Sequence, residues 1–265
     1  MGSITDKAFA KNVQRALNEL TVRVEGRTAL KVDGIFGNGS IALLKLFQND
    51  RGIPVTGQYD RATAGIIDPY IDRRYLTETS FSEAAKKLNV NVASVKAVTT
   101  VESKGEGFLA DGRQVILFER HIFLRELAKV LPPDQVAKLQ AENPDILNKT
   151  PGGYVGGMAE WTRLERAQAI HQEAALKSAS YGLFQIMGFN HKVAGFATVL
   201  EYVMASAESE TNQLMAFVNF VLANPTMLKA LQERNWAKFA SLYNGPNYAA
   251  GGYHLKLASA YTLYA

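Results

Sequence analysis

The sequence has no cysteine among its 265 residues. Disulfide bonds and thiolate metal sites are therefore excluded, and the chain is compatible with synthesis in a reducing cytoplasm. Its apolar stretches are far shorter than the roughly 20 residues that a membrane helix needs. The first residues also lack the apolar core of a signal peptide. We therefore expect a protein made in the cytoplasm, without stable membrane association and without an export signal of its own.

The excess of one charge sign over the other is also small, since 29 Lys and Arg and 25 Asp and Glu give a net charge of +4. No basic run is long enough for a nucleic-acid arm, so nucleic acid is not an expected partner. The 4 histidines lack metal-ligand spacing, and no glycine-rich nucleotide motif follows a strand. We expect neither a metal nor a cofactor. With 47% hydrophobic and 20% charged residues, the chain is typical of a globular protein of one or two domains.

Residues 1–70 show the pattern of a small domain of three short helices. Val13 and Leu17 mark one helical face. Ser40 and Asp60 are the predicted N-caps of the second and third helices. The segment contains no group of residues that could carry out chemistry, which indicates an interaction module. Its predicted core consists of Leu17, Ile35, Phe36, Leu44, Phe47 and Ile66.

Residues 32–63 of this segment resemble the three-helix peptidoglycan-binding domain found on many cell-wall hydrolases. The shared pieces are an Asp-Gly-x-Phe-Gly turn, a Phe-Gln pair and a Val-Thr-Gly followed by Asp and Thr, in matching order and spacing. Ser40 stands where a threonine is usual, which keeps the hydroxyl. Most of these motif residues also build the fold. The resemblance implies binding-domain candidates at Asp33, Phe36, Gln48, Thr56 and Asp60.

Residues 71–80 are the expected linker, and residues 81–265 are predicted to form a larger domain. Ser82 is the predicted N-cap of its first helix. Residues 143–158 are rich in Gly, Pro and Asn and predict a long loop, and long ordered loops are usually functional. The fold class that follows is mainly α, with an α+β second domain that contains a short hairpin. Its helices are predicted at 92–102, 121–130, 164–176, 198–223, 225–242 and from about 253 onward.

The helix predicted to end at Glu102 leads into a hairpin around Asp111 and Gly112. Asp-Gly between two extended arms favours a type I′ turn. A carboxyl group at a helix C-terminus sits at the negative end of the dipole, so its charged form is disfavoured. That is one way in which a glutamate becomes a proton donor. On these local features alone, an ordinary surface glutamate is the favoured interpretation.

Three elements placed in order along the second domain change that interpretation. Val101-Glu102-Ser103, Gly182-Leu183-Phe184-Gln185 and Tyr243-Asn244-Gly245 resemble elements of the lysozyme-like superfamily of muramidases and lytic transglycosylases. Together with the Phe-Glu-Arg-His sequence at 118–121, they resemble the modular phage endolysins that carry an N-terminal peptidoglycan-binding domain and a C-terminal N-acetylmuramidase domain. The resemblance covers nearly the whole chain.

This resemblance implies cleavage of the β-1,4 bond between N-acetylmuramic acid and N-acetylglucosamine, with Glu102 as the general acid. A second carboxylate or a positioned water must act on the other face of the sugar. Glu119 is the first candidate, with a structural ion pair as an equal alternative. Asp111 is the second candidate for this carboxylate, but a structural role in the turn is favoured for it over a catalytic one. The implied substrate-binding residues are Tyr154, Tyr181, Gln185, Tyr243 and Asn244.

Other activities stay open at this point. The same glutamate could support lytic transglycosylation, and a lysozyme-like domain could persist without activity in a wall-binding virion protein. Amidase or peptidase action usually needs a zinc site that the sequence does not show. For the leading interpretation we expect a monomer whose partner is the peptidoglycan glycan strand. It would wait in the host cytoplasm until another protein breaches the inner membrane, and would then reach the periplasm and cell wall.

Overall fold

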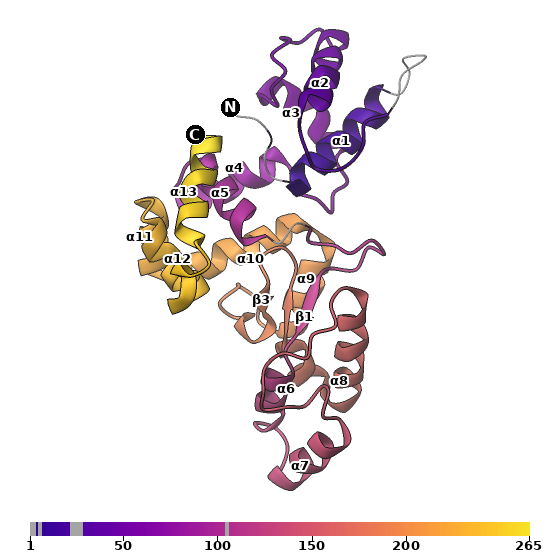
Figure 1. Ribbon diagram of the computed structural model, residues 1–265, viewed down its shortest axis with the longest axis vertical. Coiled ribbons are helices and arrows are strands. Elements are labelled where there is room, and N and C mark those ends of the chain that lie inside the picture. The colour runs from indigo at the N-terminus through magenta and orange to yellow at the C-terminus, as the bar shows by residue number, and fades with distance from the viewer. Residues whose placement is uncertain (1–3, 5–6, 22–28, 104–105) are drawn as a thin grey trace. The chain divides into compact units, whose positions relative to one another are not determined.

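Figure 1 shows the computed structural model, which describes residue 4 and residues 7–21, 29–103 and 106–265. Thirteen α-helices and one three-stranded antiparallel sheet lie among these residues, so the predicted mainly α fold is confirmed. The chain divides into two compact units, residues 1–105 together with 224–265, and residues 106–223.

The first unit begins with α1, and its predicted apolar face is confirmed because Val13 and Leu17 are fully buried. Leu44 and Phe47 on α2 complete this core. Ile35 is wrong as a core residue, since its side chain is 69% exposed. The cause is that Gln14 holds the polar backbone of the turn inward: its Nε2 donates to the Ile35 carbonyl and its Oε1 accepts from the Asp33 and Gly34 amides. The helices here are α1 (Lys7–Thr21), α2 (Asn38–Asp50), α3 (Arg61–Ile67) and the short 3-10 helix η1 (Asp68–Tyr70).

One of the two N-caps predicted in this segment is confirmed. The Asp60 carboxylate accepts the Thr63 backbone N–H at the start of α3. The other prediction is wrong, because α2 begins earlier, with Gly37 in the N-cap position. Ser40 therefore lies inside the first turn, where its hydroxyl accepts a hydrogen bond from Gln14 Nε2 at 3.1 Å.

The helix α4 (Glu78–Leu88) starts inside the predicted linker. Thr77 is its N-cap, and the Ser80 hydroxyl reaches back to the Thr77 backbone N–H, which forms a capping box. The prediction of Ser82 as the cap is therefore wrong. Two hydroxyl residues just upstream already satisfy the first amides of the helix, and the Ser82 hydroxyl donates to the Glu78 carbonyl instead.

The helix α5 runs from Val92 to Glu102 as predicted, with Asn91 as its N-cap. The final helix packs along it (Figure 1). Two tyrosine hydroxyls near the C-terminus strengthen this contact: Asn91 Nδ2 donates to Tyr261 at 2.7 Å, and Thr100 shares a 2.8 Å bond with Tyr264. The C-terminal helices of this unit pack on one another in turn, and α13 joins them to α5. They are α11 (Pro225–Gln232), α12 (Trp236–Asn244), the 3-10 helix η3 (Pro246–Ala249) and α13 (Tyr253–Tyr264).

The second unit is built around the small sheet, in which the strand order is β1-β2-β3 and Leu117 pairs with Ser180. Stacked rings fill its core, with Phe184 and Phe217 4.6 Å apart. Its strands are β1 (Ile116–Phe118), β2 (Ala179–Tyr181) and β3 (Ile186–Met187). Its helices are α6 (Arg120–Leu127), α7 (Pro133–Glu142), α8 (Met158–Lys177), the 3-10 helix η2 (Gly188–Asn190), α9 (Val199–Glu208) and α10 (Glu210–Leu222).

The predicted hairpin ahead of β1 is present, but its predicted turn type is wrong. A type I′ turn requires positive φ at both central residues, and here Gly112 has φ +85° while Asp111 does not have positive φ. Leu109 accepts the Gly112 amide and donates to the Arg113 carbonyl. This is the three-residue loop of a type I turn followed by a left-handed glycine. The Asp111 carboxylate favours it by accepting the Arg113 backbone N–H.

No single helix in the described part of the chain is long and apolar enough to cross a membrane. Only α10 and α11 taken together, across the bend that joins them, reach the required length and hydropathy.

Candidate active site

Glu102 is the last residue of α5, and Asn244 is the last residue of α12. The Asn244 amide nitrogen donates a 2.7 Å hydrogen bond to Glu102 Oε2. The other carboxylate oxygen, Oε1, is buried and has no hydrogen-bond partner among the described residues. Residues far apart in the sequence therefore meet at one carboxyl group, and the structure brings together two of the predicted site residues.

Burial is the largest influence on this carboxyl group and raises the pKa of Glu102 to about 7. The hydrogen bond from Asn244 and the positive charge of Lys256 act in the opposite direction but do not cancel the effect. The position at a helix C-terminus adds to the penalty on the negative charge. A carboxyl group in this state holds a proton near neutral pH and can deliver it to a leaving oxygen.

Tyr243 lies next to Asn244 on the same helix, as the sequence motif predicts. Its ring stacks on Phe239 with centroids 5.9 Å apart, and it is half-buried. The stacking fixes the ring beside the residue that contacts Glu102, so Tyr243 can line the same surface.

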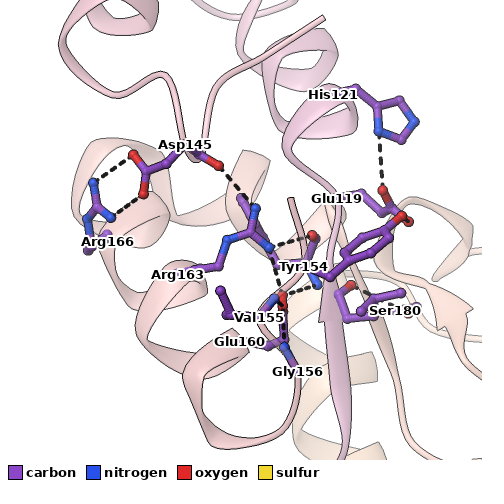
Figure 2. Close-up of polar contacts among 12 residues, drawn as sticks. Glu119, His121, Asp145, Tyr154, Val155, Gly156, Glu160, Arg163, Arg166 and Ser180 are labelled. Carbon is purple, nitrogen blue, oxygen red and sulfur yellow. Dashed lines mark hydrogen bonds and ion pairs between the residues drawn. The ribbon is translucent and has the colours of Figure 1, made fainter. Parts of the chain in front are cut away.

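Glu119 lies between β1 and α6 in the second unit, and two rings point at its carboxylate (Figure 2). The Tyr154 hydroxyl donates to Oε1 at 2.7 Å. His121 Nδ1 lies 3.2 Å from Oε2, which is ion-pair range, although the two atoms are not aligned for a hydrogen bond. Burial, followed by the bond to Glu119, raises the pKa of Tyr154 to about 12. These contacts fit both interpretations of Glu119: a reacting carboxylate held in place, or a carboxylate whose ion pair only stabilises the fold.

The predicted long loop is present between α7 and α8, and a buried glutamate that sequence reasoning missed holds its end. Glu160 has no solvent exposure. Its Oε1 accepts the backbone N–H groups of Val155 and Gly156, at 2.6 and 3.0 Å. Its Oε2 accepts the Phe118 N–H at 3.1 Å and Arg163 Nη1 at 2.8 Å. Burial alone would raise the pKa of this carboxyl, but these donors outweigh it and hold the pKa below its usual value.

Gln185 turns its amide toward the protein rather than outward. It has a left-handed backbone, with φ +49°. Its Nε2 donates to the Gly182 carbonyl at 2.8 Å, and its Oε1 accepts the Ser180 hydroxyl at 2.8 Å. The half-buried side chain thus fixes the turn between β2 and β3.

The structure does not support Tyr181 as a substrate-binding residue. Its side chain is only 1% exposed, and its hydroxyl donates to the Leu176 carbonyl at 2.9 Å. The ring packs edge-on against Tyr202. All three residues of this strand are buried, so Tyr181 belongs to the core.

Asp111 serves the turn, which was the favoured interpretation. Besides the Arg113 amide, its carboxylate accepts Arg113 Nε at 2.7 Å. That side-chain bond is the main reason why the pKa of Asp111 lies below its usual value. A carboxyl group with a lowered pKa on an exposed turn is not suited to donate a proton.

Most of the predicted residues in the peptidoglycan-binding domain build its framework. Gln48 has no exposure and donates to Thr56, Thr63 and the Gln58 carbonyl. Thr56 in turn donates to Asp60 at 2.8 Å. Asp33 is likewise engaged, accepting from Gln14 and from the Ile35 amide. Phe36, the one apolar candidate of the five, is partly exposed.

Within the described ranges, no group of three or more His, Asp or Glu side chains could hold a metal ion. The arrangement that remains is a half-buried glutamate with a raised pKa at a helix end, with an asparagine and a tyrosine beside it. This arrangement is consistent with a glycoside hydrolase of the lysozyme type.

Comparison with known proteins agrees with this class. The N-acetylmuramidase family model matches residues 91–265, and the model of a putative peptidoglycan binding domain matches residues 7–67. Among solved structures, the crystal structure of Burkholderia AP3 phage endolysin is 42% identical, with a TM-score of 0.72, and the match covers 96% of this chain and 95% of that one. No curated protein is significantly similar. The chain belongs to the N-acetylmuramidase family and is a peptidoglycan hydrolase.

Proposed function

We propose that this enzyme hydrolyses the β-1,4 bond between N-acetylmuramic acid and N-acetylglucosamine, with Glu102 as the general acid. The observation that carries the proposal is the carboxyl group of Glu102 at the end of α5, which Asn244 contacts on Oε2 and whose Oε1 is buried. This burial raises the pKa of Glu102 to about 7. Glycosidic oxygen is a poor leaving group, so a carboxylic acid must protonate it while positive charge develops on the sugar.

The surroundings of Glu102 assign a role to each of its oxygens. Asn244 donates to Oε2, which leaves Oε1 as the oxygen that carries the proton. After proton transfer, the carboxylate keeps the Asn244 hydrogen bond and gains from the positive charge of Lys256. Both contacts are stronger in the charged product state than in the neutral acid, so they lower the cost of releasing the proton.

Glu119 stays the predicted second carboxylate. The Tyr154 hydroxyl donates to its Oε1 at 2.7 Å and holds the carboxylate in one orientation. The same bond would serve a purely structural carboxylate equally well, so the assignment depends on kinetics of a Glu119→Gln variant.

The first test is the Glu102→Gln variant, assayed by release of reducing ends from purified peptidoglycan. We expect a loss of roughly 10²- to 10⁴-fold in kcat, the usual contribution of general acid catalysis. The matched control is Glu142→Gln, because Glu142 also ends an α-helix but has a side chain that is 54% exposed. The control should keep full activity, and an active Glu102→Gln enzyme would refute the assignment.

The second test separates hydrolysis from lytic transglycosylation, which the same acid could support. Hydrolysis adds water and leaves a reducing N-acetylmuramic acid end. Transglycosylation uses the sugar's own hydroxyl and leaves a 1,6-anhydro end that is lighter by one water. Mass spectrometry of the soluble products distinguishes them, and anhydro products would exclude the proposed reaction.

We further propose that the enzyme acts as a monomer in host lysis, without nucleic acid as a partner. It would remain in the host cytoplasm until another protein opens the inner membrane, and the peptidoglycan-binding domain would then raise its local concentration on the wall. Bacteria that express the protein alone should stay intact, whereas co-expression of a pore-forming protein should cause rapid lysis. Lysis without the pore would contradict this route, and light scattering of the purified protein checks the monomer.

A further inference from the structure

The loop between α7 and α8 is attached to the rest of the second unit at several places, two of which flank Tyr154. Near its end, Glu160 accepts the Val155 and Gly156 amides. In its middle, Arg120 donates to the Thr150 and Pro151 carbonyls. Between these two attachments lies the loop segment that carries Tyr154, so the segment is held from both sides.

A glycine at 153 makes the second attachment possible. It has φ +75°, and a Cβ added there would lie 2.9 Å from an Arg120 guanidinium nitrogen. The left-handed backbone disfavours any residue with a side chain here, and a Cβ would also meet the Arg120 guanidinium. Tyr154 is the next residue along the chain.

The two oxygens of Glu160 bind the two backbone segments that carry Tyr154 and Glu119. Figure 2 shows Glu160 beside Val155 and Gly156, and the Tyr154 ring beside Glu119. Oε1 holds the loop just after Tyr154, whereas Oε2 holds the Phe118 amide just before Glu119. One buried carboxylate therefore sets the position of both partners of the 2.7 Å Tyr154–Glu119 hydrogen bond.

Arg163 keeps this carboxylate charged and oriented. Its Nη1 donates to Glu160 Oε2 and to the Phe118 carbonyl, and its Nη2 donates to the Asp145 carbonyl at 3.1 Å. Asp145 lies at the start of the same loop and pairs with Arg166. The start and the end of the loop are thus attached to one helix, α8.

The segment held in this way presents apolar surface. Tyr154, Val155 and Met158 are 46%, 61% and 52% exposed. A tyrosine with an exposed ring and a hydrogen-bonded hydroxyl can stack on a sugar without a large loss of side-chain entropy. The exposed ring is held beside a carboxylate through Glu160, whose own side chain has no solvent exposure.

We propose that Glu160 is a positioning residue for peptidoglycan hydrolysis. It fixes Tyr154 against Glu119, and thereby the surface on which the glycan strand is held. Misplacement of a substrate-positioning group by about 1 Å can cost on the order of 10²-fold in rate. The proposal rests on the proposed glycan hydrolysis but not on the assignment of Glu102.

The test is a double-mutant cycle between Glu160 and Tyr154, read as kcat and KM on purified peptidoglycan. Tyr154→Phe removes only the hydroxyl that bonds Glu119, and we expect it to lower kcat/KM about 5- to 10-fold. Glu160→Gln replaces an acceptor oxygen by an amide that faces the Phe118 N–H and Arg163, and should lower kcat/KM roughly 10- to 100-fold. In the Glu160→Gln background, Tyr154→Phe should cost less than about 2-fold, because the hydroxyl is no longer held in place.

A second variant covers the case in which Glu160→Gln does not fold. Glu160→Asp keeps the charge beside Arg163 but is one methylene shorter, so it cannot reach both the loop amides and Phe118. It should show the same loss of coupling to Tyr154→Phe, with a smaller loss of stability.

The matched control is Glu126→Gln in the same unit. Glu126 is also buried, at 5% exposure, and its hydrogen bonds and ion pairs go to Arg125 and Lys129 rather than to the loop. Activity is compared at a temperature at which circular dichroism shows all variants folded. Glu126→Gln should leave kcat/KM and the effect of Tyr154→Phe unchanged.

Additive effects of Glu160 and Tyr154 substitutions would overturn the proposal, as would an equal loss of activity in the Glu126→Gln control. Failure of the proposed function has a different signature. In that case the wild-type enzyme releases no reducing ends, or Glu102→Gln remains active.

Discussion

Glu102 and Glu160 are both glutamates largely withdrawn from water, yet their pKa values move in opposite directions. Glu102 receives one hydrogen bond, from the neutral amide of Asn244, and its pKa rises to about 7. Glu160 receives three backbone amides and the Arg163 guanidinium, and its pKa falls below the usual value. The first is set to hold a proton at neutral pH, and the second remains a carboxylate.

The comparison teaches that burial alone does not determine what a carboxyl group does. Burial penalises the charge in both cases, and the number and charge of the donors decide whether that penalty is offset. At the end of α5 the donors are few, which suits a proton donor. At the start of α8 they are many, which suits an anchor for loop and strand.

The largest expected effect is on the free energy of unfolding, when Glu160 is replaced. Glu160→Gln should lower the free energy of unfolding at pH 7 by about 3–5 kcal/mol, because it leaves Arg163 buried without its counter-charge. A lowered pKa means that the contribution of Glu160 is present above its unfolded pKa and is lost as pH falls through the folded pKa. Urea unfolding at pH 7 and below pH 4 measures this. A cost that does not shrink in acid would show that the charge of Glu160 is not what stabilises the fold.

Replacing Glu102 should change the free energy of unfolding in the opposite direction. Its pKa is raised from 4.5 to about 7, so the folded state holds its proton more tightly, and wild-type stability is lost as pH rises through this window. Glu102→Gln removes the titrating group, and should therefore gain about 2–3 kcal/mol over wild type between pH 4 and pH 8. Urea unfolding of both proteins across this range checks the prediction. A pH-independent difference between them would remove the evidence for a raised pKa.

The smallest expected effect concerns Lys256, whose charge lowers the pKa of Glu102. Lys256→Met should move the alkaline limb of the kcat/KM profile to higher pH by a fraction of a unit, because the acid then keeps its proton longer. Lys256 is exposed, so salt screens its charge, and the shift between variant and wild type should fade as ionic strength rises. A shift toward lower pH would contradict the assigned electrostatics.

Local patterns predicted much of the fold correctly because the forces involved act within a few residues. The spacing of Val13 and Leu17 predicted a buried helical face, and Asp60 was identified as a cap from its place before a short helix. Predictions failed where several local solutions compete. The hairpin could close with a type I′ turn or with a three-residue loop, and α4 could be capped by Thr77 or by Ser82.

The residues of the candidate site likewise divide into those that local sequence patterns could predict and those that they could not. The motif around Glu102 and the Tyr-Asn pair at 243 and 244 could be recognised in the sequence, and the structure shows that Asn244 contacts Glu102. Tyr181 lies in an equally recognisable motif but is buried in the core. Glu160 could not be found, since an acidic residue three positions before an arginine is common on helix surfaces.

The sequence by itself determined several of the helices, the wall-binding module, the family resemblance and the identity of the candidate acid, because periodicity, caps and short motifs carry that information. It did not predict α7, or that the segments predicted at 198–223 and 225–242 are two helices each. Only the tertiary structure decided how each carboxyl group behaves. The pKa of Glu102 depends on burial and on Asn244, which is 142 positions away along the chain, and the anchoring by Glu160 depends on backbone amides from separate segments. Desolvation and hydrogen-bond donors act through space, so a sequence names the residues, and the fold assigns their chemistry.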